Sequence, residues 1–209
     1  MDGIFAVNKP RGMTSHDIVN IVRRKTGVKR VGHGGTLDPM ATGVLVIAVG
    51  RDNTKLLEKY VKGKKEYIAE IFLGANSDTY DAEGTIENVN ENVISSKAEI
   101  QKMIKLFIGN IEQIPPIFSS VKISGKPAHR RVRAGQDVKL EARNVTIYSI
   151  GILSYQYPTL KLKVTTGPGV YIRSLAYDLG QKLGTGAYLS GLTRTKVGNF
   201  ALKDALNLD

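Results

Sequence analysis

The stretch that decides the fold covers residues 32 to 49 and reads Gly32-His33-Gly34-Gly35-Thr36-Leu37-Asp38-Pro39-Met40-Ala41-Thr42-Gly43, then Val44-Leu45-Val46-Ile47-Ala48-Val49. An apolar run of this length that follows glycines is typical of a buried strand. Asp38 therefore lies on a glycine-rich loop that leads into the core, and Pro39 restricts its backbone to an extended conformation. Because glycines let a partner approach the backbone closely, this loop is suited to present one carboxylate to a bulky substrate.

The composition is that of an ordinary globular protein with a strongly basic balance. The chain has 209 residues, of which 42% are hydrophobic and 23% are charged, and its net charge is +11. This much positive charge favours a polyanionic partner, with nucleic acid as the first choice. No apolar stretch approaches the roughly 20 residues that span a bilayer, and the N-terminus lacks a signal-peptide pattern, so we expect a cytoplasmic protein.

The sequence argues against a metal centre and against disulfides. It contains no cysteine, and its three histidines (His16, His33 and His129) do not have metal-ligand spacing. The acidic cluster at residues 77–84 lacks the spacing of an EF-hand loop, and Asx turns explain it better. Zinc-dependent deamination of a nucleobase is therefore not expected.

Hydrophobic patterns and capping residues predict an irregular alternation of strands and helices, which indicates an α+β fold. We expect strands at residues 3–8, 44–49, 65–73, 119–123, 145–153, 160–165 and 193–197, and helices at 15–25, 55–61, 96–107 and 171–183. Residues 74–84 are expected as loop, and residues 128–134 as basic helical turns. Ser15 and Thr54 are predicted N-caps, and Ser96 with Glu99 is predicted to form a capping box. No repeat or linker divides the chain, so we expect one domain over residues 1–209.

Asp-Pro is a common turn pair, so an isolated Asp38 would most simply close a turn. The whole string at residues 33–43, His-Gly-Gly-Thr-Leu-Asp-Pro-Met-Ala-Thr-Gly, however, resembles the active-site motif of the TruB family, the bacterial tRNA pseudouridine-55 synthases. The resemblance implies that Asp38 is the nucleophile of the reaction. It also implies the pseudouridine synthase fold, a mixed and largely antiparallel sheet flanked by helices and loops.

Two further motifs extend the resemblance to a catalytic set. Residues 65–67, Lys-Glu-Tyr, match a Lys-x-Tyr element, which implies that Tyr67 packs on the target base; a half-buried strand aromatic is the structural alternative. Residues 167–176 lead into a helix and resemble Gly-Thr-Tyr-Ile-Arg-Ser-Leu, with departures at Pro168 and Val170. This match places Arg173 against Asp38, where a fixed guanidinium would keep the carboxylate ionised in a pocket that excludes water.

The remaining matches imply residues that bind the substrate RNA, and these are His33, Lys9, Tyr171, Leu192, Lys122, Arg130 and Arg131. Lys9 is expected either as an ordinary surface charge or as support for the loop that bears Asp38. Leu192 is expected to line the pocket. The basic segment at residues 113–135 resembles two elements of the family. Its cations cluster near an aromatic residue, as expected for contacts with RNA phosphates. His129 stands there in place of the usual tyrosine.

The resemblance implies an isomerase that acts as a tRNA pseudouridine(55) synthase on a T-loop uridine, after that base has flipped out of its stack. It implies tRNA as the partner, no cofactor, no metal and no membrane, and we expect a monomer without a PUA-type RNA-binding domain in residues 1–209. Two alternatives stay open: a guide-RNA-dependent synthase acting on ribosomal RNA, and a tRNA-binding chaperone. The Met-Ala-Thr-Gly at residues 40–43 favours the stand-alone bacterial enzymes. The intact set of Asp38, Tyr67 and Arg173 argues for chemistry.

Overall fold

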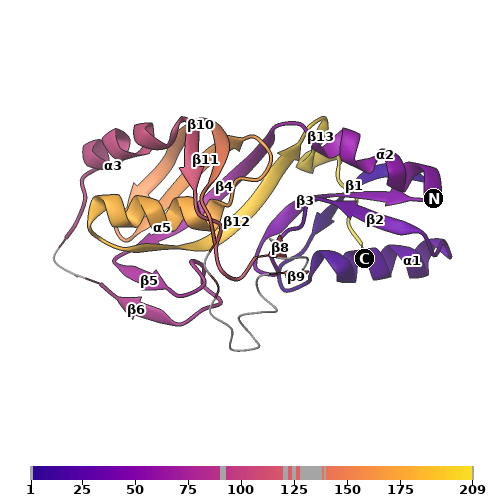
Figure 1. The fold of residues 1–209 in the computed structure, drawn as a ribbon, viewed down its shortest axis with the longest axis horizontal. Helices are drawn as coiled ribbons and strands as arrows, with labels where there is room; N and C mark the ends of the chain where they lie inside the picture. Colours follow the sequence, from indigo (N-terminus) through magenta and orange to yellow (C-terminus); the bar gives the residue numbers. More distant parts are fainter. Residues whose placement is uncertain are drawn as a thin grey trace.

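The computed structural model describes residues 2–89, 93–119, 122–123, 126–127, 138 and 140–208. Figure 1 shows its elements, which are in chain order β1 (Gly3–Lys9), α1 (Ser15–Thr26), β2 (Val31–Gly34), β3 (Thr42–Val49), α2 (Arg51–Val61), β4 (Lys65–Leu73), β5 (Ala75–Ser77), β6 (Ile86–Asn88), α3 (Lys97–Ile104), η1 (Lys105–Phe107), β7 (Gly109–Gln113), β8 (Lys122–Ile123), β9 (Lys126–Pro127), β10 (Arg143–Gln156), β11 (Thr159–Thr166), α5 (Ile172–Leu183), β12 (Ala187–Val197), β13 (Phe200–Ala201) and η2 (Leu202–Asp204).

The apolar run at residues 44–49 forms most of β3 and is buried on both of its faces. Even-numbered side chains from Val44 to Ala48 pack in the same cluster as Leu57 of α2. Odd-numbered side chains from Leu45 to Val49 pack with the apolar face of α1. Because helices cover both faces of the strand, its sequence shows no alternation of apolar and polar residues.

The main sheet is mixed and largely antiparallel, which confirms the predicted fold class. Among the described residues its strand order is β1-β3-β12-β4-β11-β10-β7, with β2 beside β3 and β13 beside β12. The described strand pairs of this sheet are antiparallel, with one exception. Strands β3 and β12 are parallel, and there Thr193 lies opposite Thr42 and Arg194 opposite Gly43. Strand β12 thus lies between β4 and the end of the loop that bears Asp38.

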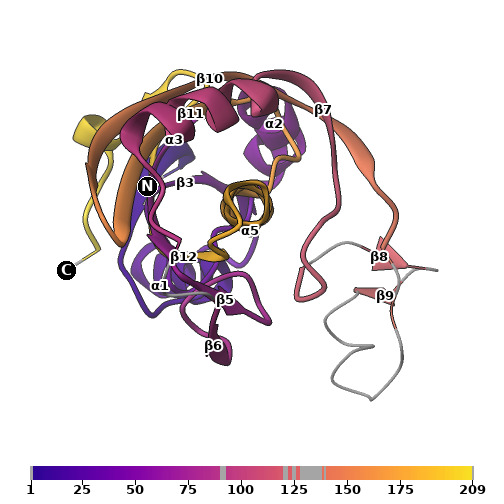
Figure 2. The same cartoon turned by 90° about the vertical axis from the view of Figure 1, so that its left-hand side faces the viewer.

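Helix α5 lies inside the curve of the sheet, where Figure 2 shows it end-on. Its side chains Ile172, Leu175 and Leu179 are buried in the large cluster formed with β4, β11 and β12. The helix comes so close to β12 that a Cβ added at Gly180 would overlap the backbone of Ala187. This packing fixes the first turn of α5 over the centre of the sheet.

Helix α1 begins differently from the prediction. Thr14, and not Ser15, is its N-cap, and Thr14 forms a capping box with Asp17. Ser15 is buried, and its hydroxyl bonds to the backbone of Leu37 instead. Both residue types cap helices well, so the choice between them is made by a distant segment that needs a buried partner.

Helix α2 also begins earlier than predicted, directly after Gly50. The φ of 91° at Gly50 turns the chain from β3 into the helix without a side-chain cap. Thr54 therefore lies inside the helix, where its hydroxyl donates to the carbonyl of Arg51 at 2.8 Å. The predicted capping box of Ser96 and Glu99 is confirmed at the start of α3.

The strand predicted at residues 193–197 is part of the longer β12, which begins at Ala187. The other differences concern short elements. The predicted loop at residues 74–84 contains β5, which pairs with β6. Of the strand predicted at residues 119–123, the structure has the two-residue β8, and the basic turns predicted at 128–134 lie outside the described residues. The described helices are too short or too polar to cross a membrane. One domain over residues 1–209 stays a prediction.

Candidate active site

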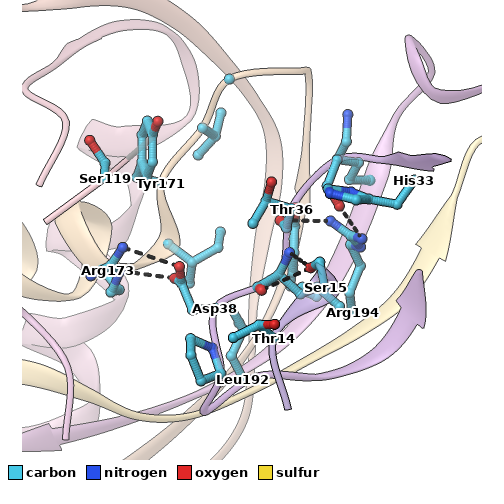
Figure 3. Close-up of a pocket in the computed structure, with 18 of the residues that line it drawn as sticks. Thr14, Ser15, His33, Thr36, Asp38, Ser119, Tyr171, Arg173, Leu192 and Arg194 are labelled. Carbon is cyan, nitrogen blue, oxygen red and sulfur yellow. Dashed lines mark hydrogen bonds and ion pairs between the residues drawn. The ribbon is translucent and has the colours of Figure 1, made fainter. Parts of the chain in front are cut away.

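A cavity of about 890 Å³ lies where the loop that bears Asp38 meets β2, β4, β12 and the first turn of α5. It brings together most of the side chains predicted from the sequence, namely Asp38, Tyr67, Arg173, His33, Tyr171 and Leu192. Figure 3 labels these residues except Tyr67. The side chain of Lys122 and the residues Arg130 and Arg131 lie outside the part of the chain that the structure describes.

The loop that bears Asp38 is held on both sides of the carboxylate. Before it, Ser15 Oγ accepts from the N–H of Leu37 at 2.9 Å and bonds to the Leu37 carbonyl at 3.1 Å. After it, Lys9 Nζ donates to the carbonyl of Pro39 at 3.2 Å. The Asp38 carbonyl itself accepts from the N–H of Ala41 at 3.0 Å. The backbone under the carboxylate is therefore fixed independently of what the carboxylate contacts.

Lys9 lies beneath this loop and is fully buried. Besides Pro39, its Nζ donates to the carbonyls of Pro10 and Met13, at 2.9 and 2.6 Å. Burial lowers the pKa of Lys9 to about 8, and the nearby carboxylate of Asp38 limits this shift. Of the two positions considered for Lys9, the structure has the buried, supporting one. An ammonium group in this place has no surface to offer an RNA.

Arg173 links two carboxylates with one guanidinium group. Its Nη2 donates to Asp38 Oδ1 at 3.3 Å and to the carbonyl of Phe118 at 3.0 Å. Its Nε forms an ion pair with Asp38 Oδ2 at 3.0 Å, although the N–H of Nε does not point at that oxygen as a hydrogen bond requires. Its Nη1 donates to Asp81 Oδ2 at 3.1 Å. The pairing of Arg173 with Asp38 expected from the sequence is present.

The electrostatics of Asp38 combine opposing effects. Burial raises the pKa of this carboxyl group, and the Arg173 guanidinium opposes the rise. The carboxylate of Asp81 adds to the rise, whereas Lys9 and Arg194 act with Arg173. The side chain of Asp38 is still 35% exposed toward the cavity. A substrate can therefore reach a carboxylate that neighbouring cations help to keep ionised, which is what a nucleophile needs.

Arg194 is a site residue that the sequence reasoning missed. It lies opposite Tyr67 in the pairing of β12 with β4 and is 2% exposed. Its Nε donates to the carbonyl of Val44 at 2.8 Å and its Nη2 to that of Gly35 at 2.9 Å. Burial raises the pKa of Tyr67, and Arg194 opposes this rise. A Cβ at Gly43 would overlap the carbonyl oxygen of Arg194, so the last glycine of the motif is required by the approach of these strands.

His33 and Tyr171 also line the cavity (Figure 3). Burial and the charge of Arg194 lower the pKa of His33, which favours the neutral form of its imidazole. Tyr171 is the residue before α5, and its backbone is fixed by the amide of Gln113, which accepts at 2.8 Å and donates at 3.0 Å. Gln113 begins the segment that the sequence related to RNA binding, and here it positions the start of α5.

The acidic loop at residues 77–84 contributes to the site through Asp81. A predicted Asx turn is present at Asp81, which accepts from the N–H of Glu83 at 3.0 Å. Asp78 instead accepts from the more distant N–H of Thr85, at 2.8 Å. Asp81 is also buried against Arg173. The local spacing of the loop carries no signal for this partner, because Arg173 is distant in the sequence.

Comparison with known proteins agrees with the geometry of the site. The profile of the TruB family pseudouridylate synthase N-terminal domain matches residues 23–172, and that of the tRNA pseudouridylate synthase B C-terminal domain matches residues 173–209. The tRNA pseudouridine synthase B of Protochlamydia amoebophila is 46% identical over 207 residues, which cover 99% of this chain and 78% of that protein. The protein of the same name from Clostridium tetani is 43% identical over 209 residues, or 100% and 72% of the two chains.

Among solved structures, a chain in the crystal structure of a Cbf5-Nop10-Gar1 complex superimposes with a TM-score of 0.77 and 29% identity. The match covers 99% of this chain and 52% of that chain, so this protein spans about half of its length. The motif around Asp38, the sheet that positions it and the profile match over residues 23–172 all lead to one conclusion. This chain belongs to the TruB family of pseudouridylate synthases.

Proposed function

We propose that this protein converts a T-loop uridine of tRNA, at position 55, into pseudouridine, with Asp38 as the nucleophile. The observation that carries the proposal is the ion pair of Asp38 with Arg173 at 3.0 Å, in a cavity that Tyr67 also lines. Two relatives that match almost the whole chain bear the name tRNA pseudouridine synthase B, which supports tRNA as the substrate.

The first requirement of this reaction is access to the base. A stacked uridine cannot reach a carboxylate inside a cavity, so the nucleotide flips out at a cost on the order of a few kcal/mol. The cavity of about 890 Å³ has room for a nucleotide. Tyr67 and Leu192 line it and would bound the flipped base. The net charge of +11 favours binding of the RNA backbone, and His33 contributes a neutral contact.

The chemistry then exchanges one glycosidic bond for another. Asp38 attacks either C6 of the uracil or C1′ of the ribose, and both routes break the N1–C1′ bond. The bond that Asp38 forms is temporary: an ester at C1′ breaks when C5 attacks that carbon, and an adduct at C6 is eliminated when the C5=C6 double bond re-forms, so both routes regenerate the free carboxylate. The uracil turns while it stays in the cavity, and a C5–C1′ bond forms. C5 loses a proton and N1 gains one, so the product has the atoms and electrons of the substrate. No redox cofactor is therefore called for, and Tyr67 and Asp38 both lie in the cavity as candidate bases for the C5 proton.

Incubation of the purified protein with an unmodified tRNA transcript, followed by pseudouridine mapping, tests the proposal. We expect one modified uridine in the T-loop, and no product from a transcript in which cytidine replaces that uridine. Product formed only on ribosomal RNA with an added guide RNA would favour the guide-dependent alternative. Refolding of tRNA without any product would favour the chaperone.

We also propose that the protein acts as a monomer in the cytoplasm. One chain supplies Asp38, Tyr67 and Arg173 to a single cavity, so no second copy is needed to complete the set. A tRNA substrate is made in the cytoplasm of a bacterium, which supports that location. Light scattering of the free protein and of its tRNA complex checks the oligomeric state.

A further inference from the structure

Tyr80 has a backbone conformation that few residues other than glycine adopt. Its φ is 63°, the one positive value at a non-glycine position among the described residues. This left-handed conformation is disfavoured because the Cβ atom approaches the following carbonyl oxygen, so surrounding contacts must hold it. Tyr80 directly precedes Asp81, the buried carboxylate that pairs with Arg173. A local strain thus lies next to a residue that contacts the catalytic set.

Two sets of contacts hold Tyr80 in place. Its ring stacks on the ring of Tyr177 in α5, with centroids 4.1 Å apart and an interplanar angle of 16°. Its backbone N–H donates to the carbonyl of Ser77 at 3.0 Å, and its own carbonyl accepts from the N–H of Leu189 in β12 at 3.0 Å. Tyr80 is therefore fixed to the helix by its ring and to the sheet by its backbone.

The helix presents matching positions to the loop. Arg173 and Tyr177 are one helical turn apart on α5 and so lie on the same face of it. These two helix residues contact two adjacent loop residues. Asp81 pairs with Arg173 at 3.1 Å, and Tyr80 stacks on Tyr177. Loop and helix are thus joined at two neighbouring points, one polar and one aromatic.

The loop at residues 77–84 binds one end of the Arg173 guanidinium group. Nη1 of Arg173 donates to Asp81 Oδ2 and, at 3.3 Å, to the carbonyl of Thr79. Nε and Nη2 are the nitrogens that contact Asp38. Because a guanidinium is planar and rigid, the direction of its Nη1 end determines the direction of the edge that faces Asp38.

We propose that Tyr80 and Tyr177 are positioning residues of this site: their stack keeps Asp81 against Arg173 and thereby aims the guanidinium at Asp38. The inference deepens the proposed function and rests on it, because it needs Asp38 and Arg173 to act in the reaction. It assigns a role to two aromatic side chains that the sequence motifs around Asp38, Tyr67 and Arg173 do not include.

The test compares two stacked pairs in the same protein. Tyr177→Leu removes the stack on Tyr80 with a residue that suits a helix. Tyr188→Leu removes a second stack, that of Tyr188 on Phe72, whose rings are 5.3 Å apart at 24° and do not line the cavity. Tyr80→Phe keeps the aromatic ring and serves as the conservative variant. Melting temperatures show which variants are folded.

We expect Tyr177→Leu to lower the single-turnover rate at saturating tRNA by about tenfold or more, which is within the range for a misplaced catalytic group. Its tRNA affinity should stay within about twofold of the unaltered value, because the stack does not line the cavity. Tyr188→Leu and Tyr80→Phe should keep the rate within about twofold. A normal rate in Tyr177→Leu, or an equal loss in Tyr188→Leu, would overturn the inference.

A double-mutant cycle separates positioning from a general structural role. If the stack acts through Asp81, adding Tyr177→Leu to Asp81→Asn should change the rate by less than about twofold. The same loss in both backgrounds would show that the stack does not act through Asp81 and would refute the inference. Failure of the proposed function is distinguishable, since the unaltered protein would then make no pseudouridine at all.

Discussion

At the scale of single residues, one guanidinium group governs both the charge and the direction of the candidate nucleophile. Arg173→Lys keeps the positive charge but loses the planar fork that contacts Asp38 and Asp81 together. We therefore expect Arg173→Lys to lower the single-turnover rate at saturating tRNA by a factor of about 100 or more. Rapid-quench measurement of pseudouridine formation gives this rate directly.

The matched variant for this prediction is Arg173→Met, which removes the charge as well. If charge alone mattered, Arg173→Lys would be nearly as active as the unaltered protein and only Arg173→Met would fail. The apolar positions Ile172, Leu175 and Leu179 that anchor α5 are unchanged in both variants. Arg173→Met leaves the buried Asp81 carboxylate without its partner, at a cost of about 3–5 kcal/mol, so melting temperatures establish that each variant is folded before its rate is compared. Unaltered rates in Arg173→Met would contradict any action of Arg173 on Asp38.

Arg173→Met should also shift the pH dependence of the single-turnover rate. Burial raises the pKa of Asp38, and Arg173 is the largest influence that opposes the rise. Without Arg173 the carboxyl group stays protonated, and therefore inactive as a nucleophile, up to a higher pH. We expect the acidic limb of the single-turnover rate to lie at higher pH in Arg173→Met than in the unaltered protein. An acidic limb at an unchanged or lower pH would show that Asp38 does not titrate in this step.

At the scale of elements, close packing of α5 on β12 determines where Arg173 lies. Gly180→Ala would place a Cβ atom on the backbone of Ala187, whereas an added Cβ at Gly151 of β10 has nothing within 4 Å. We expect Gly180→Ala to lower the free energy of unfolding by about 1–3 kcal/mol, the range for overpacking. Gly151→Ala should leave it unchanged or raise it slightly, because alanine restricts the unfolded chain. Urea denaturation compares the two, and equal midpoints would refute the assigned packing.

Most elements of this fold could be predicted because their signals are local. The strand predicted at 65–73 is β4, and the helix predicted at 171–183 is α5 together with Tyr171 before it. The start of α1 could not be predicted, because Thr14 and Ser15 are both suitable N-caps in isolation and serine is, if anything, the better one. The buried backbone of Leu37 takes the hydroxyl of Ser15, and Thr14 is left to cap the helix. Tertiary structure therefore decides which of the two residues caps the helix.

At the scale of the whole molecule, the order of strands was the information that the sequence lacked. Nothing local indicates that β12 enters between β3 and β4, or that Arg194 lies opposite both Gly43 and Tyr67. Taken alone, an arginine in a strand is most simply a surface cation. Asp38, Tyr67 and Arg173 could be predicted because each belongs to a motif. The positions of Arg194 and Asp81 in the site could not be predicted, because their partners come from segments that are distant in the sequence.

The overall charge of +11 predicts how tRNA binding responds to salt. If phosphate contacts dominate, log affinity should fall with log salt by a slope of about −0.7 to −0.9 for each phosphate contacted. Replacing Arg130 and Arg131 by alanine should flatten the slope and leave the single-turnover rate at saturation intact. Filter binding over a range of salt concentrations measures both slopes. An unchanged slope would move the RNA-binding surface to another part of the molecule.

The central claim is that the carboxylate of Asp38 is the nucleophile, and Asp38→Asn tests it most directly because the amide keeps the shape and removes the carboxylate with its negative charge. The measurement is the single-turnover rate of pseudouridine formation at a tRNA concentration shown to saturate the same preparation. We predict no detectable pseudouridine, with tRNA affinity close to that of the unaltered protein. Product formation above a few per cent of the unaltered rate would contradict the account, because another group would then carry out the attack.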